Sequence, residues 1–329
     1  SALGLTAATG VHADTTLRLG HLWPAQSAVN QDLIKAWADQ VTQDANGTLE
    51  VEIYPSQTLS KASSAYEGVV NGVADITVTL QGYTAGRFPL TEIVQLPGVS
   101  ASAPQGACIL QSLYDDGALG DEYADSHLLF LFTTGPAPLH TRDTEVQTPA
   151  DLEGLRIFTF PTAGKFLSQF GVVPVTLPWE DVQVAMQTGE LDGMAWSGIT
   201  EDYTVGWADV TDYFLTNNIS GAWIGSFFVN QQQWADLPDH LKQLVMAGIE
   251  AGHTYRNQWY WGGEARLRAQ GDKLKLSTVP AGEWAEVENA AKDFWTEIAE
   301  EGEVHAKIVQ IFRDYNDVIN KAGPPYTNG

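Results

Sequence analysis

Strand-like and helix-like segments alternate along this chain, and the alternation restricts the fold more than any other feature of the sequence. Thr15–Gly20 carries β-branched or apolar residues at every second position, which favours a strand, and Leu49–Tyr54 and Ala74–Leu80 have the same character. Between them, Ala28–Gln43 and Ala65–Val70 have the apolar spacing of helices. The order β-α-β-α-β predicts a parallel sheet covered by helices.

The same plan returns in the second half of the chain. The elements expected there are strands over Leu155–Phe160, Pro174–Leu177 and Gly193–Trp196, and helices over Ala163–Phe170 and Trp179–Thr188. Before them come a helix over about Pro104–Tyr114, a strand over Leu128–Thr133 and the loop Gly135–Pro138, which we interpret as the crossing into a second domain. Phe214–Asn230 is long enough to run between the domains, and Gly282–Lys321 is predicted to be helical.

Composition excludes several classes of partner. The chain has 329 residues, enough for two domains with separate cores, and 17 basic against 41 acidic residues give a net charge of −24. Binding of nucleic acid or of an anionic membrane surface requires clustered Lys and Arg, so neither partner is expected. The acidity has two interpretations: long-range attraction of a cationic ligand, or a surface adapted to high salt.

Motifs for catalysis and for metal binding are absent from the sequence. It contains no H-E-x-x-H, no G-x-S-x-G, no phosphate loop and no dinucleotide fingerprint, and its seven histidines lack ligand spacing. We therefore expect no catalytic residues, no metal and no cofactor. The single cysteine, Cys108, is expected to be a buried structural thiol.

The first thirteen residues are small and apolar and end in Val11-His12-Ala13, a small-residue pattern typical of signal-peptide cleavage. We expect residues 1–13 to be the end of a signal peptide, the alternative being an unrelated leader, and the mature protein to be exported to the periplasm. No run of 18 apolar residues is present, so direct membrane insertion is not expected.

The segment Thr148–Gly193 resembles the signature of a known family, the DctP-type extracytoplasmic solute receptors of tripartite ATP-independent periplasmic (TRAP) transporters. In that family the segment reads roughly P-x-D-L-x-G-L-K-I-R-x-P, followed by P-x-x-E-V-Y-x-A-L-Q-x-G-x-V-D-G. Tyr54–Leu59, Glu67–Asp75 and Phe88–Pro97 resemble further family elements, so the likeness covers essentially the whole mature chain.

The resemblance implies a two-domain α/β fold of the periplasmic-binding-protein type, with crossing interdomain strands and long C-terminal helices. Domain I is expected to comprise residues 14–135 and about 224–263, and domain II residues 136–223 and about 264–329. It also implies a receptor and not an enzyme: a small solute is held in the interdomain cleft by domain closure and delivered to the permease subunits of the transporter. We expect a monomer.

Phe158 departs from the family pattern at the position that matters most for the ligand. The second basic residue of the family's K-I-R run usually clamps a substrate carboxylate, and here the run is Arg156-Ile157-Phe158. A guanidinium offers paired charged donors to two carboxylate oxygens, whereas a phenyl ring offers none. A second position that is often basic in relatives aligns near Ala137. Arg156, two residues from Phe158 on the same strand face, is the main candidate for a substitute clamp, followed by Arg142 and Arg87.

The family pattern predicts an aromatic ligand pocket. Its expected aromatic members are Trp23, Tyr83, Phe158, Trp179, Trp196 and Trp223. Ring faces without an arginine suit an ammonium group, and a carboxylate normally completes the charge. Asp202 and Glu201 are the preferred counter-charges, with Glu180 and Glu67 as further candidates. The predicted ligand is a small amine or amino alcohol; the alternatives are an organic acid anchored by Arg156, and a periplasmic enzyme of unknown reaction.

Overall fold

A computed structural model of the chain describes residues 14–27, 29–100, 102–196, 206–248 and 275–322. Its strands form one nine-stranded sheet in the order β2-β1-β3-β8-β4-β7-β5-β6, with β9 beside β8. The strands are β1 (Thr15–His21), β2 (Leu49–Tyr54), β3 (Ile76–Leu80), β4 (His127–Thr141), β5 (Arg156–Phe158), β6 (Val173–Val175), β7 (Gly193–Ala195), β8 (Tyr213–Val229) and β9 (Lys275–Ser277).

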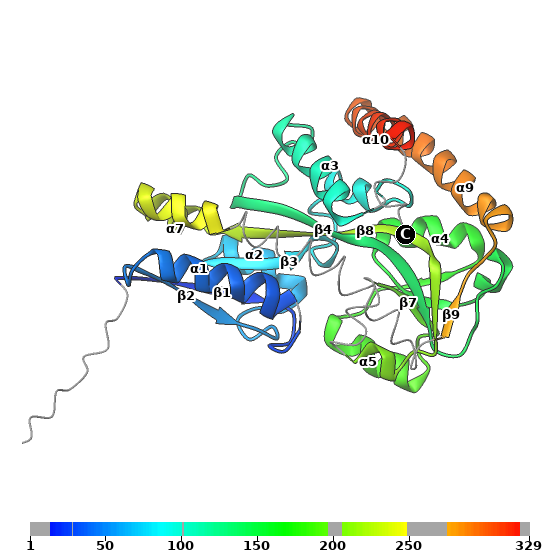
Figure 1. The fold of residues 1–329 in the computed structure, drawn as a ribbon, viewed down its shortest axis with the longest axis horizontal. Helices are drawn as coiled ribbons and strands as arrows, with labels where there is room; N and C mark the ends of the chain where they lie inside the picture. The colour runs from blue at the N-terminus through cyan, green and yellow to red at the C-terminus, as the bar shows by residue number, and fades with distance from the viewer. Residues whose placement is uncertain (1–13, 28, 101, 197–205, 249–274, 323–329) are drawn as a thin grey trace, which may run out of the picture.

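Two short parallel groups of strands are joined by two long antiparallel strands. β1 pairs in parallel with β2 and β3, and β5 pairs in parallel with β6 and β7. β4 and β8, of 15 and 17 residues, pair with each other along their length and reach both groups, as Figure 1 shows. The predicted α/β fold with crossing strands is confirmed. We call the part built on β1–β3 the first half and the part built on β5–β7 the second half.

The predicted loop Gly135–Pro138 is wrong. β4 runs through it without interruption, and its pairing with β8 shifts register repeatedly between Thr133 and Leu139. Pro136 and Pro138 have no backbone N–H to donate, so a regular ladder cannot form there. The register shifts absorb this irregularity, and the strand still crosses from one half to the other.

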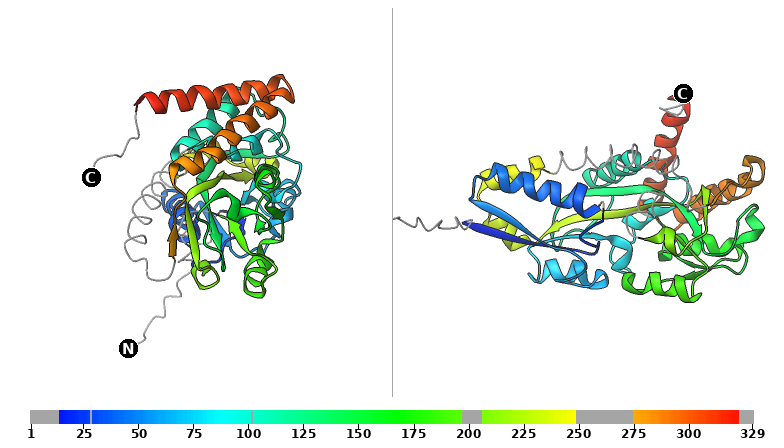
Figure 2. Two further views of the ribbon diagram at one scale, coloured as in Figure 1. Left: turned by 90° about the vertical axis from the view of Figure 1, so that its right-hand side faces the viewer. Right: turned by 60° about the horizontal axis from the view of Figure 1, so that its bottom comes forward.

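The helices cover both faces of the sheet. They are α1 (Ala36–Asp44), α2 (Ala65–Val70), α3 (Ala103–Asp115), α4 (Pro161–Leu167), α5 (Trp179–Thr188), α7 (Gln231–Asp236), α9 (Ala281–Glu300) and α10 (Glu303–Ala322). Apolar side chains of α1 and α5 belong to one buried core, and those of α3, α4, α9 and α10 belong to a second core. Figure 2 shows α9 and α10 stacked at one side of the molecule, above the crossing strands.

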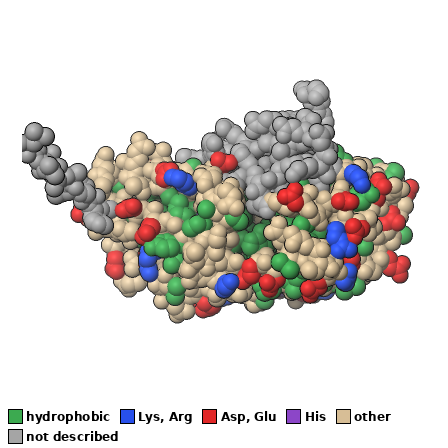
Figure 3. Space-filling model, turned by 90° about the horizontal axis from the view of Figure 1, so that it is seen from below, with side chains coloured by type: hydrophobic (Ala, Val, Ile, Leu, Met, Phe, Trp, Pro, Cys, Tyr) green, Lys and Arg blue, Asp and Glu red, His purple; other side chains and the backbone are tan. Residues whose placement is uncertain are grey.

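Several predicted elements have the bounds that the sequence indicated, namely β2, α2 and α5. The prediction for Cys108 is wrong: its thiol is exposed on α3, because the buried side of that helix is formed by Ile109, Leu110 and Leu113. None of the described helices combines the length and apolar character needed to cross a bilayer. On the coloured part of the face in Figure 3, acidic side chains are scattered with basic ones among them.

Candidate functional site

Aromatic side chains converge where the second half of the sheet meets the crossing strand β8. Phe158 is the last residue of β5, and Trp196 directly follows β7. These two strands are parallel neighbours, so their carboxyl ends lie at the same edge of the sheet. Trp179 begins α5, and Trp223 lies on β8. The structure thus brings together four of the aromatic residues that were predicted from the sequence, all of them buried.

Trp196 is at the centre of this cluster. Its ring centroid is 4.4 Å from that of Trp179, with the two rings stacked at 28°. It is 5.0 Å from Trp223 and 6.2 Å from Phe158. Phe158 and Trp223 are nearly parallel, at 11° and 6.4 Å. The cluster therefore presents several ring faces and no arginine among its members.

Phe160 connects the cluster to the first half of the molecule. Its ring centroid is 4.0 Å from that of Trp223 and 4.9 Å from that of Tyr83. Tyr83 ends the short 3₁₀ turn Gln81–Tyr83 that follows β3, and a Cβ added to Gly82 would collide with the Phe160 ring. Tyr83 was predicted as a pocket residue; Phe160 was missed, although its position two residues after Phe158 was a usable signal.

Two further tryptophans, Trp207 and Trp23, lie outside the four-residue cluster. Trp207, which the sequence interpretation missed, stands edge-on to Trp179 at 5.2 Å between ring centroids. The segment before it lies outside the described residues, and its sequence gave no periodic signal. Trp23 is buried in the same core near His21, with 6.1 Å between their ring centroids. It belongs to the first half, and among the described residues its ring does not contact the four-residue cluster.

Polar atoms of the cluster and of its neighbours Trp207 and Tyr83 are buried without hydrogen-bond partners among the described residues. Among the described residues, the indole N–H groups of Trp196, Trp207 and Trp223 and the hydroxyl of Tyr83 have none. A buried donor without a partner costs about 1–3 kcal/mol, so such groups are expected to have partners, from protein, water or ligand. Burial also raises the pKa of Tyr83 well above its usual value, so its hydroxyl keeps its proton. These donors suit a ligand that carries an oxygen acceptor.

Arg156, the candidate carboxylate clamp, is already paired. Its Nε and Nη2 donate to Asp192 Oδ2 at 2.8 Å and Oδ1 at 2.6 Å, and its backbone N–H donates to Oδ2 as well. This bidentate pairing holds the pKa of Asp192 below its usual value. The guanidinium would have to leave a fitted partner to bind a ligand carboxylate.

Glu180, the third candidate counter-charge, is paired across the two halves. Lys61 Nζ donates to its Oε1 at 2.6 Å and Gln57 Nε2 to its Oε2 at 3.1 Å, and the pKa of Glu180 is lowered, chiefly by the Lys61 hydrogen bond. Glu201 and Asp202 lie outside the described residues. Within the described part of the chain, no group of His, Cys, Asp and Glu is arranged to hold a metal ion.

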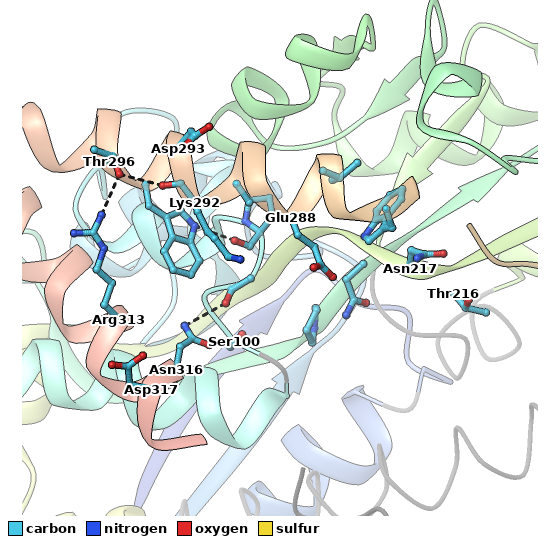
Figure 4. A pocket seen from close by; sticks show the side chains of 18 residues that line it. Ser100, Thr216, Asn217, Glu288, Lys292, Asp293, Thr296, Arg313, Asn316 and Asp317 are labelled. Atoms are coloured by element: carbon cyan, nitrogen blue, oxygen red, sulfur yellow. Dashed lines mark hydrogen bonds between the residues drawn. The ribbon is translucent and has the colours of Figure 1, made fainter. Parts of the chain in front are cut away.

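A separate hollow of about 770 Å³ lies between α9, α10 and the first part of β8 (Figure 4). Several polar side chains that line it have partners within the protein: Trp295 Nε1 donates to Pro97 O at 2.9 Å, and Arg313 Nη2 to Thr296 Oγ1 at 3.0 Å. Asn217 exchanges hydrogen bonds with the backbone of Val279. Ser100 Oγ, which also lines the hollow, is buried without a partner, but four such polar atoms gather at the aromatic rings, namely those of Trp196, Trp207, Trp223 and Tyr83. The aromatic cluster is therefore the better candidate for a ligand site.

Comparison with known proteins decides the family. The model of the bacterial extracellular solute-binding proteins, family 7 (DctP), matches residues 19–302. The chain belongs to the DctP family. The family consists of solute-binding receptors and not of enzymes, in agreement with the resemblance in the Thr148–Gly193 segment.

Solved structures of DctP relatives share the fold. A TRAP periplasmic solute-binding protein from Chromohalobacter salexigens, solved with bound (S)-(+)-2-amino-1-propanol, is 43% identical with a TM-score of 0.85, and the match covers 96% of this chain and all of that one. A marine metagenome receptor specific for aromatic acids, solved with 3-hydroxybenzoate, is 27% identical with a TM-score of 0.81, covering 91% and 97%.

Curated DctP relatives match over shorter regions. The 2,3-diketo-L-gulonate-binding periplasmic protein of Escherichia coli is 26% identical over 57% of this chain and 58% of its own length. The ectoine/5-hydroxyectoine-binding periplasmic protein of Ruegeria pomeroyi is 25% identical over 58% and 57%. The matched region thus spans a little over half the length of these relatives. Their ligands differ in charge and shape, so family membership alone does not determine the ligand of this chain.

Proposed function

We propose that this chain is the periplasmic solute receptor of a TRAP transporter, and that it binds a small amine or amino alcohol and delivers it to the membrane permease subunits. The main support for this ligand class is the cluster of Phe158, Trp179, Trp196 and Trp223, in which the ring centroids of contacting pairs are 4.4–6.4 Å apart. An ammonium group over such ring faces gains about 0.5–2 kcal/mol per contact, depending on desolvation.

Two observations favour the amine over an organic acid. Phe158 occupies the position at which the family usually places a carboxylate-binding arginine. Arg156 is held by Asp192 through two side-chain hydrogen bonds. The unpartnered indole N–H groups of Trp196 and Trp223 can in addition donate to the hydroxyl oxygen of an amino alcohol. The 43% identical receptor from C. salexigens, whose structure contains an amino alcohol, supports the same class.

The proposed cycle uses closure of the two halves on the ligand. A ligand that contacts both halves favours the closed arrangement by its differential affinity for it. Domain I is proposed to comprise residues 14–135 and about 224–263, and domain II 136–223 and about 264–329. In this proposal the exported protein acts as a monomer, and Glu201 or Asp202 can contribute negative charge near Trp196.

A thermal-shift screen tests the ligand class. Purified protein is heated with 2-amino-1-propanol, other small amines and quaternary ammonium compounds, and with benzoate and small aliphatic acids. At about 100 times its Kd a ligand stabilises the folded state by about 2.7 kcal/mol, which raises Tm by about 4 °C for a chain of this size. Amines are expected to raise Tm and simple acids are not. Stabilisation by acids alone would contradict the proposal.

The same incubation separates a receptor from an enzyme. Mass spectrometry of the stabilising compound after hours with the protein should show it unchanged. Formation of a product in proportion to protein concentration would favour the enzyme alternative.

A further inference from the structure

Glu92 is a buried acidic side chain that the ligand proposal has not used. It lies in the 3₁₀ segment Thr91–Gln95, which precedes α3, and only 8% of its surface is exposed. Its Oε2 accepts a hydrogen bond from Thr162 Oγ1 at 3.1 Å. Its Oε1 is buried and has no hydrogen-bond partner among the described residues, and no described lysine or arginine pairs with it.

Two contacts place Glu92 and its segment against elements that carry aromatic residues of the site. Thr162 lies in the first turn of α4, two residues after Phe160, whose ring is in contact with those of Trp223 and Tyr83. On the other side, the Thr91–Gln95 segment packs against β8 so closely that a Cβ added to Gly221 would lie 2.5 Å from Gln95 O. Gly221 is two residues from Trp223 on the same strand, so the segment that carries Glu92 packs against the strand that carries Trp223.

A second buried carboxylate nearby shows what a structural role would look like. Glu122 accepts hydrogen bonds from the backbone N–H of Leu90 at 2.5 Å and of Thr91 at 3.0 Å, and from the Thr91 hydroxyl at 2.6 Å. These donors account for the burial of Glu122. Glu92 has a single hydroxyl donor and a free oxygen, so its burial is not explained by contacts within the described protein.

We infer that Glu92 supplies the negative charge that binds the ammonium group of the ligand, between the aromatic cluster and the first turn of α4. This inference rests on the proposed amine function. An ammonium donates three hydrogen bonds, and Glu92 Oε1 offers it an acceptor in a desolvated position. Charge and ring faces together bind a primary amine, whereas a carboxylate ligand would be repelled.

The carboxylate also gives ligand binding a defined pH dependence. Desolvation raises the pKa of Glu92 to about 7, the hydrogen bond from Thr162 opposes the rise, and the facing charge of Glu122 adds to it. Only the ionised form attracts an ammonium. The ionised fraction falls from about 0.9 at pH 8 to about 0.03 at pH 5.5, so Kd for the amine should be about 30-fold weaker at pH 5.5. Binding below pH 7 should release a proton.

Titration calorimetry with (S)-2-amino-1-propanol at pH 5.5, 7 and 8 tests the inference. Wild-type protein should follow the pH dependence above, with proton release measured from the buffer dependence of the heat. Glu92→Gln keeps the shape of the side chain and should weaken binding at pH 8 at least tenfold and abolish the pH dependence. Glu92→Asp keeps the charge and should retain part of it. Glu180→Gln is the matched control at a paired carboxylate and should keep the pH dependence.

The outcomes separate this inference from the proposed function. If wild-type protein binds the amine and Glu92→Gln binds it equally well with the same pH dependence, the function stands and the role of Glu92 is refuted. The same holds if affinity is lost in Glu201→Gln or Asp202→Asn and not in Glu92→Gln. If wild-type protein binds carboxylates and no amine, both proposals fail. Thermal melting of each variant without ligand verifies that it is folded.

Discussion

Gly82→Ala tests whether the two halves of the molecule meet in the ligand-binding conformation. Gly82 lies in the turn after β3, in the first half, and a Cβ placed on it would have three ring carbons of Phe160 within 2.7 Å. Real Cβ atoms essentially never approach other atoms closer than 3.0 Å. The backbone of Gly82 has no positive φ, so alanine causes no conformational strain of its own.

The clash cannot be relieved by a simple ring movement. Phe160 is fully buried and fixed edge-on by Trp223 on one side and Tyr83 on the other. Overpacking a well-filled site costs about 1–3 kcal/mol. If the two halves separate when the ligand leaves, the clash raises the free energy of the closed form and not that of the open form. The ligand must then supply it, and Kd should rise by about 5-fold to 150-fold, since 1.4 kcal/mol corresponds to a factor of ten.

Titration calorimetry with 2-amino-1-propanol measures Kd, and urea unfolding without ligand measures stability. Gly135→Ala is the matched control, because a Cβ at Gly135 on β4 would meet no atom within 4 Å. Gly82→Ala should bind much more weakly than Gly135→Ala and unfold at a similar urea concentration. Equal Kd values for the two variants would refute the reasoning. A loss of stability without ligand as large as the loss of binding energy would show that the contact belongs to the ligand-free fold as well.

Three further predictions concern ion pairs and a buried histidine. Glu180→Gln removes the exposed salt bridge to Lys61, which contributes about 0.2–1 kcal/mol. The Kd for the amine should therefore rise about 1.4-fold to fivefold at low salt, and less at 0.5 M NaCl because salt screens the charges. An equal rise at both salt concentrations would argue against a charge interaction. Asp192→Asn should lower Tm at pH 7 because it removes the carboxylate that pairs with Arg156. Since the pKa of Asp192 is lowered in the folded state, the difference in Tm from wild type should shrink as the pH falls through and below 3.8. A difference in Tm that stays constant with pH would contradict this. Burial lowers the pKa of His21 to about 4, so the folded state resists protonation of this side chain. Between pH 6.5 and 4 the free energy of unfolding of wild-type protein, measured in urea, should therefore fall by up to about 3 kcal/mol more than that of His21→Asn. Parallel pH profiles for the two proteins would show that His21 does not cause the loss of stability.

The sequence was sufficient for the elements with strong periodic patterns. The strand Leu49–Tyr54 alternates buried and exposed residues, and helix α5 begins at Trp179 after a proline, so their bounds follow from local preferences. Prolines interrupt strand pairing, so the sequence around Pro136 predicts a loop, but the long partner strand β8 keeps β4 extended through this region. Local chemistry cannot show such a partner, because it is supplied by residues about 80 positions away.

For the site, the sequence determined the chemistry and the tertiary structure decided the partners. The Thr148–Gly193 segment identified the family, and Phe158 within it indicated the loss of the usual carboxylate clamp. Only the fold shows that Arg156 is engaged by Asp192 and that Glu180 is engaged by Lys61. Only the fold brings Glu92 next to Thr162, which lies 70 residues away in the chain. The physical reason is that the charge available to a ligand depends on burial and on pairing between distant segments, which residue identity and spacing do not contain.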